Sequence, residues 1–168
     1  MSAASPDFFI RLAVAGDVDT LSAFNIAMAR ETEGLRLLPA VVAAGVRRVL
    51  ADPALGFYLV AEEQGQAVAG LLVTTEWSDW RNGCFWWIQS VYVLPQARRQ
   101  GMFRALYRHV WQLAQAQPQV CGVRLYVERD NEAAQHTYRG LGMAETEYRV
   151  MEELRPGLVW KEEGSPPR

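Results

Sequence analysis

The sequence predicts an α+β fold built around one right-handed β-α-β crossover. Three observations predict it: a long strand-like run over 84–93, a strongly periodic helical segment that opens at Gly101, and another apolar run over 120–127. A strand, a helix and a strand in this order place the two strands side by side and parallel. The 168 residues fit one domain. We expect this domain to span 1–168, with a core of about 8–155 and frayed ends.

The elements before the crossover follow from periodicity and turn signals. We expect, in order, a strand over 8–14, a helix capped by Asp17 and ended by Gly34, a helix from Pro39 to Asp52, and β-rich runs over 57–62 and 67–75. The triplet Gln64-Gly65-Gln66 predicts a hairpin between the last two runs. With the 84–93 strand, these runs form a three-strand antiparallel meander.

The crossover helix carries the strongest period in the chain. Apolar residues from Phe103 to Ala114 recur at i, i+3, i+4, i+7, i+8 and i+11, and Gln117-Pro118 ends the helix. After the 120–127 strand, Asn131 caps another helix that ends at Gly142. We expect a final strand or hairpin over 144–154.

The composition favours a cytoplasmic protein with no nucleic-acid or membrane partner. Seventeen basic and nineteen acidic groups give a net charge of −2, which offers no attraction for a nucleic-acid backbone. We find no targeting pattern and no apolar run near the roughly 20 residues of a membrane span. Cys84 and Cys121 lack C-x-x-C spacing, so we expect buried thiols. Neither His109 nor His136 has a partner at metal-ligand spacing, which predicts no metal site.

A candidate anion site lies where the long strand runs through a polar loop into the strongest helix. A helix that opens at a glycine directs unpaired N–H groups outward, and its dipole favours an anion there. Phosphate is the ligand we expect, with close backbone approach at Gly101 and charge-assisted hydrogen bonds from Arg98 and Arg99. Arg104 and Arg108, one turn apart, either reach a further phosphate or form a solvated helix face. The loop matches neither a P-loop nor a Rossmann fingerprint.

The loop resembles the signature of the GNAT superfamily of acyl-CoA-dependent N-acyltransferases, Q/R-x-x-G-x-G/A. Here it reads RRQGMF over 98–103, so Phe103 replaces the final Gly or Ala. A second segment, from Asn131 to Met143, is similar to the superfamily pattern N-x-x-A-x-x-x-Y-x-x-x-G-F/M. Two motifs in the expected order identify the chain as a member of this superfamily.

The resemblance implies a mixed, mainly antiparallel sheet of six to seven strands, flanked by about four helices, with splayed parallel central strands. It also implies acetyl-CoA as the acyl donor. In such folds, backbone groups of the central strand bind the pantetheine arm and polarise the thioester carbonyl. The residues expected to bind this cofactor are Val91, Tyr92, Val93, Arg98, Arg99, Gln100, Gly101, Met102, Phe103 and Asn131.

Tyr138 is the candidate general acid, as the resemblance also implies. It lies two helical turns after Asn131, so both side chains share one face of the helix. A tyrosine with a pKa near 10 can protonate a departing thiolate whose pKa is near 8.5. The alternative is a tyrosine packed in the core.

The general base stays open, because many relatives place a Glu on the central strand where this chain has Gln89 and Ser90. The proton could pass through water to Glu31, Glu76 or Glu128, or the free amine could be drawn from solution. Each of these carboxylates could equally be a solvated surface group.

The acceptor should meet the first two helices and the tip of the hairpin over 76–83. Trp77 and Trp80, beside Glu76, could hold a cationic amine through ring faces and charge, and Glu31 lies in a second acidic run. The two tryptophans could equally serve hairpin packing.

The sequence thus favours an enzyme that transfers an acetyl group from acetyl-CoA to a primary amine by direct attack in a ternary complex. We expect the acceptor to be a small molecule or a peptide. The resemblance also implies a homodimer, which is common in the superfamily. One alternative is a noncatalytic acyl-CoA-binding or regulatory domain. Another is an unrelated α+β module that binds a different phosphorylated ligand.

Overall fold

The computed structural model describes residues 8–166, which fall into two compact units. One unit runs up to Leu125 and resumes at Trp160, and the other is Tyr126–Val159. The expectation of frayed ends at 1–7 and 167–168 lies outside the described residues. That the whole chain is one domain stays a prediction.

The larger unit holds every strand of the sheet and three of the helices. In chain order these are β1 (Phe8–Leu12), α1 (Val18–Glu33), α2 (Pro39–Ala51), β2 (Phe57–Glu63), β3 (Gln66–Ser78), β4 (Gly83–Val93), α3 (Met102–Gln115) and β5 (Val120–Leu125). The smaller unit holds α4 (Glu132–Gly140). Short 3₁₀ turns occupy Ala15–Asp17, Asp79–Arg81 and Pro95–Ala97.

The strands form one mixed sheet in the order β1-β2-β3-β4-β5. The first four pair antiparallel with their neighbours, whereas β4 and β5 pair parallel across the α3 connection. This confirms the α+β class, the antiparallel meander and the parallel crossover pair. Over the described part of the chain the sheet has five strands, so the expected six to seven is wrong.

The missing element is the strand or hairpin expected over 144–154. This segment is irregular, and Tyr148, Val150 and Met151 are 78%, 69% and 95% exposed. The smaller unit has no strand among its described residues, so the segment finds no partner there for its backbone N–H and C=O groups. A strand-like local pattern alone does not make a strand.

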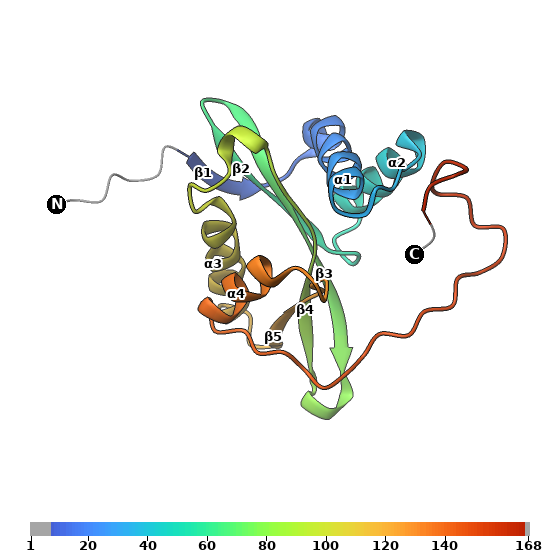
Figure 1. Cartoon of the computed structure of the whole chain (residues 1–168). Coiled ribbons are helices and arrows are strands. Elements are labelled where there is room, and N and C mark those ends of the chain that lie inside the picture. The colour runs from blue at the N-terminus through green and yellow to red at the C-terminus, as the bar shows by residue number, and fades with distance from the viewer. Residues whose placement is uncertain (1–7, 167–168) are drawn as a thin grey trace. The chain divides into compact units, whose positions relative to one another are not determined.

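Helices cover the sheet on both faces, with α1 and α2 on one face and α3 on the other (Figure 1). Alternate residues of β2 supply the two cores: Tyr58 and Val60 pack with α1 and α2, whereas Leu59 and Ala61 point to the other face. Gly70 of β3 admits α1 closely, since a Cβ there would lie 2.8 Å from Leu21. Both faces of the central strands are therefore covered by helices.

Asp17 has a different local role from the helix cap expected of it. Its side chain makes no cap hydrogen bond to α1. Instead, its carboxylate accepts the Val14 N–H at 2.7 Å and two Arg11 N–H groups at 2.8 and 2.9 Å. Arg11 also donates to Glu62 at 2.7 Å. The Arg11 guanidinium lowers the pKa of Asp17, although burial acts in the opposite direction.

We expect Asp17→Asn to reduce the free energy of unfolding by about 2 kcal/mol at neutral pH, because Arg11 loses its charged partner. The folded-state pKa of Asp17 lies below its unfolded value, so this contribution is present above the unfolded pKa. It disappears as the pH falls below about 4 and through the folded pKa. Urea unfolding of both proteins at pH 7 and pH 3 tests this, and an unchanged difference at pH 3 would contradict it.

Candidate functional site

The candidate site begins where β4 continues beyond its parallel neighbour. The pairing of β4 with β5 ends at Ile88↔Leu125, whereas pairing with β3 on the other side continues to Val93. Over the described residues, 89–93 therefore has a strand partner on one edge only. The backbone on the β5 side of this stretch is an open strand edge.

A β-bulge decides which backbone groups face this open edge. Leu71 pairs with Val91 and Val73 with Ile88, so Gln89 and Ser90 together lie opposite Leu72. Farther along, Leu94 donates its N–H to Val68. Backbone groups alternate in direction along an antiparallel strand, so those of Tyr92 face β3. Those of Val91 and Val93 face the open edge.

The loop after β4 ends in a glycine that opens α3. Gly101 is the N-cap with a left-handed φ of 78°, and no side chain caps this helix. A Cβ built there would meet no heavy atom within 4 Å. The first N–H groups of a helix have no partner inside it and attract an anion. The loop thus fits the diphosphate expected from the sequence.

The two arginines of this loop differ in their surroundings. Arg98 donates Nε–H to the Val93 carbonyl at 2.9 Å and forms an ion pair with Glu31 through Nη2 at 2.7 Å. Arg99 is exposed and has a left-handed φ of 65°. Among the neighbouring residues, the Gln100 side chain donates to the Gln96 carbonyl, and Met102 is buried. The Phe103 ring is tilted against the Tyr107 ring, with 6.3 Å between the ring centres.

Glu31 and Tyr92 lie beside Arg98. The Tyr92 hydroxyl donates to one oxygen of Glu31 at 2.6 Å, and Arg98 donates to the other. These two donors lower the pKa of Glu31, and burial together with Glu31 raises the pKa of Tyr92. Glu31 is thus a carboxylate whose oxygens both accept hydrogen bonds.

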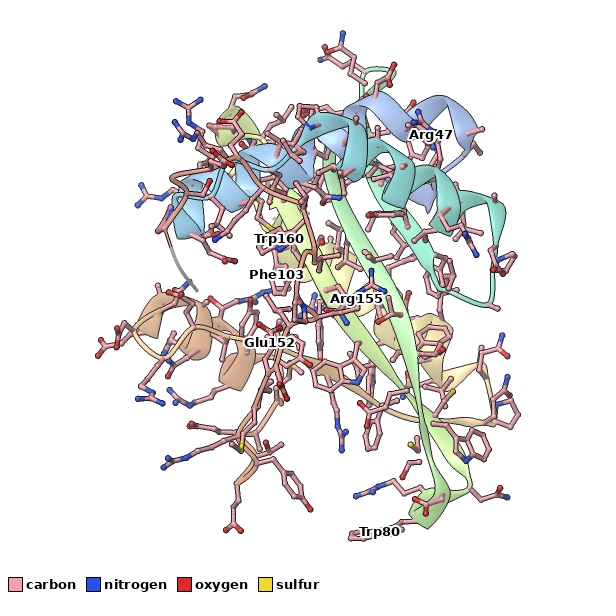
Figure 2. The ribbon with its side chains drawn as sticks, turned by 90° about the vertical axis from the view of Figure 1, so that its right-hand side faces the viewer. Arg47, Trp80, Phe103, Glu152, Arg155 and Trp160 are labelled. Atoms are coloured by element: carbon pink, nitrogen blue, oxygen red, sulfur yellow. The ribbon has the colours of Figure 1, made fainter. Side chains whose placement is uncertain are left out.

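The hairpin tip holds the other residues expected to meet an acceptor. Trp77 is 62% exposed and Trp80 is 83% exposed, and Figure 2 shows Trp80 at the tip of the hairpin. Glu76, by contrast, accepts from the Trp87 indole N–H and from Arg124, whose Nη1 lies 3.0 Å away. The rings are accessible, whereas both oxygens of the carboxylate are occupied.

The second motif lies in the smaller unit. Asn131 is the N-cap of α4, and its side-chain oxygen accepts the Ala134 N–H at 3.0 Å, as its sequence position predicted. Tyr138 lies on the same helix, and burial raises the pKa of its hydroxyl. The hydroxyl is therefore protonated at neutral pH and can act as a proton donor.

Arg124, on β5 beside the hairpin residue Glu76, is a residue that the sequence reasoning did not single out. It pairs with Glu76, and its guanidinium carbon lies 3.6 Å from the centre of the Phe85 ring. The one sequence feature that could have indicated Arg124 was its position on the strand parallel to β4. Cys121 is exposed and Cys84 partly exposed, so the expectation of buried thiols is wrong. Within 8–166, His, Cys, Asp and Glu side chains form no group of three that could hold a metal ion.

The fold and the strand–loop–helix arrangement are those of an acyltransferase. The family model described as acetyltransferase (GNAT) family matches residues 24–143. The chain belongs to this family. Acetyl-CoA is the acyl donor of the family. The comparison with curated proteins gave no match. Each helix in 8–166 is too short or too polar to cross a bilayer.

Solved structures share the fold over most of the chain. A possible acetyltransferase from Clostridium difficile 630 is 41% identical, with a TM-score of 0.83 over 88% of this chain and 97% of its own. Aminoglycoside N-acetyltransferase AAC(6')-Iy in complex with CoA is 14% identical, with a TM-score of 0.72 over 92% and 99%. Ribosomal-protein-alanine N-acetyltransferase from Brucella melitensis biovar Abortus 2308 is 16% identical, with a TM-score of 0.69 over 88% and 99%.

We expect Gly101→Ala to fold but to bind CoA at least about tenfold more weakly, because a left-handed alanine costs about 1–2 kcal/mol and the loop amides turn to relieve it. Gly65→Ala is the matched control, since Gly65 has a φ of 79° and equally open space in the β2–β3 turn. Calorimetric titration with CoA and thermal melting check both variants. Equal CoA affinity in the two would contradict this role for Gly101.

Proposed function

We propose that this protein transfers an acetyl group from acetyl-CoA to a primary amine by direct attack. The observation that carries the proposal is the open edge of β4 running through a short loop into the uncapped start of α3. The edge offers the backbone groups of Val91 and the N–H of Val93, whose carbonyl accepts from Arg98, and the helix start offers an anion site. An extended pantetheine arm with a diphosphate at its end has the matching chemistry.

The donor is held by backbone groups of this chain at the start of α3 and along the open edge of β4. The N–H groups at the start of α3 bind the diphosphate, and the Gly101 backbone permits close approach. The free N–H of an open strand edge can also donate to the thioester oxygen, where negative charge grows during attack. Asn131 supports the smaller unit by capping α4.

The chemical step forms one bond and breaks one bond at the acetyl carbon. The amine nitrogen attacks the thioester carbonyl, a C–N bond forms, and the C–S bond breaks to release the thiolate. Tyr138 donates its hydroxyl proton to the thiolate and recovers a proton from solvent. The nitrogen loses its extra proton to water. Gln89 cannot accept this proton, and its side chain donates to Thr74 at 3.0 Å.

The acceptor contacts we propose are the faces of Trp77 and Trp80. Both rings are exposed, and an exposed aromatic face attracts an ammonium group. The names of two solved structures with this fold, an aminoglycoside N-acetyltransferase and a ribosomal-protein-alanine N-acetyltransferase, support an amine acceptor. Both oxygens of Glu31 and of Glu76 already accept hydrogen bonds within the protein, so we propose no direct contact between either carboxylate and the acceptor.

Thiol release from acetyl-CoA tests this function directly. A panel of polyamines, aminoglycosides, amino acids and peptides is incubated with the protein, and free CoA is measured with a thiol reagent. We expect release that depends on at least one amine and product heavier by one acetyl group. CoA binding without release on any amine would instead indicate a noncatalytic binding domain.

We expect Tyr138→Phe to lower kcat by about 100-fold and to change the KM for acetyl-CoA by less than about twofold, because only proton donation is lost. Tyr148→Phe is the control, since Tyr148 is 78% exposed and lies in the same unit. Steady-state kinetics on the best amine measure both. A parallel loss of acetyl-CoA binding in Tyr138→Phe would mean that the side chain is structural.

We expect Trp80→Ala to raise the KM for the amine by about fivefold, the loss of one exposed cation–π contact of about 1 kcal/mol. The side chain is 83% exposed, so the melting temperature should not change. The Kd for CoA, measured in the same preparation, should also stay constant. An unchanged amine KM would remove Trp80 from the acceptor site.

A further inference from the structure

The start of the donor loop is tied to α1 by a small polar network. Glu31, in the last turn of α1, accepts the Tyr92 hydroxyl at 2.6 Å through Oε1 and the Arg98 Nη2–H at 2.7 Å through Oε2. Tyr92 is only 8% exposed, whereas the side chains of Glu31 and Arg98 are 42% and 43% exposed. One carboxylate thus joins α1 to the end of β4 and the loop that follows it, two regions more than 60 residues apart in the sequence.

Arg98 is held in this network from more than one direction. Its Nε–H donates to the Val93 carbonyl at 2.9 Å, and its guanidinium carbon lies 5.4 Å from the centre of the Tyr92 ring. The carbonyl of Val93 faces the open edge of β4, so this bond covers one of the polar groups exposed there. Arg98 therefore fixes the path of the chain between β4 and Gly101.

Arg99 stands in contrast to its neighbour. Within 8–166 its side chain has no hydrogen bond or ion pair, and its backbone is left-handed. Arg98 is committed to Glu31 and Val93, so Arg99 is the loop arginine that keeps its donors for a ligand. The two adjacent arginines differ because Glu31 binds Arg98 and not Arg99.

We propose that Glu31 is a positioning residue of the donor site. It holds Arg98 between α1 and the end of β4 and thereby fixes the loop in the conformation that binds the diphosphate. It acts through Arg98 and touches neither the donor nor the reacting atoms. The inference rests on the proposed donor site. It assigns to Glu31 neither the acceptor contact nor the proton transfer that its sequence position suggested.

A double-mutant cycle with Glu31→Gln, Arg98→Ala and the double variant tests this. We expect each single variant to bind CoA about fivefold more weakly, and the double variant to bind no more weakly than either, because all three variants lose the same Glu31–Arg98 ion pair. At saturating acetyl-CoA, kcat should stay within about twofold, since Glu31 takes no proton. Binding of pantetheine, which lacks the diphosphate, should be unchanged in Glu31→Gln.

Asp19→Asn is the control, because Asp19 is an exposed carboxylate on the same helix. If Arg98 instead binds the diphosphate itself, Arg98→Ala will weaken CoA binding and Glu31→Gln will leave it unchanged or tighten it, which overturns the proposal. A collapse of kcat in Glu31→Gln with a changed pH profile overturns it as well. A native protein that does not bind CoA would overturn the donor site and this proposal together.

Discussion

The proposed donor site depends on the interruption of strand pairing along β4. In a strand inside a sheet, the backbone N–H and C=O groups form hydrogen bonds with two neighbouring strands, so none is left for a ligand. Here β5 stops pairing at Ile88, and the bulge at Gln89 and Ser90 shifts the register against β3. The end of β4 is still held by β3, yet its other edge offers the backbone groups of Val91 and the N–H of Val93. A rigid strand thus presents free polar groups, which is costly unless water or a ligand satisfies them.

The charges near this edge lie in a network that we propose orders the loop before a ligand binds. A chain with 17 basic and 19 acidic groups has no general attraction for anions, so phosphate affinity must come from local geometry. The uncapped start of α3 supplies that geometry, and the Glu31–Arg98 pair fixes one end of the loop. Ordering the loop in advance reduces the entropy that binding must overcome.

Local sequence signals predicted the elements that carry this site. The period from Phe103 to Ala114 and the glycine before it located α3 and its start, because apolar spacing and left-handed backbone are properties of short segments. The same kind of signal failed over 144–154, where a strand needs a partner that the pattern does not specify. Asp17 has the position of a helix cap, yet its carboxylate bonds to Val14 and Arg11.

Contacts between distant segments could not be predicted from spacing. Glu31 and Arg98 are separated by 67 residues, and nothing in either motif indicates that they meet. Their pairing exists because α1 covers the face of β4 that carries Tyr92. Sequence reasoning therefore located the loop that we propose for the donor but missed its contacts with Glu31.

Backbone amide NMR during a CoA titration tests the central claim most directly. We predict that the N–H signals of Val91, Val93, Gly101 and Met102 shift at the lowest CoA concentrations that give any change, while those of β1 and β2 stay constant. Shifts that begin elsewhere in the sheet while these four signals stay fixed would contradict a donor site at the open edge of β4.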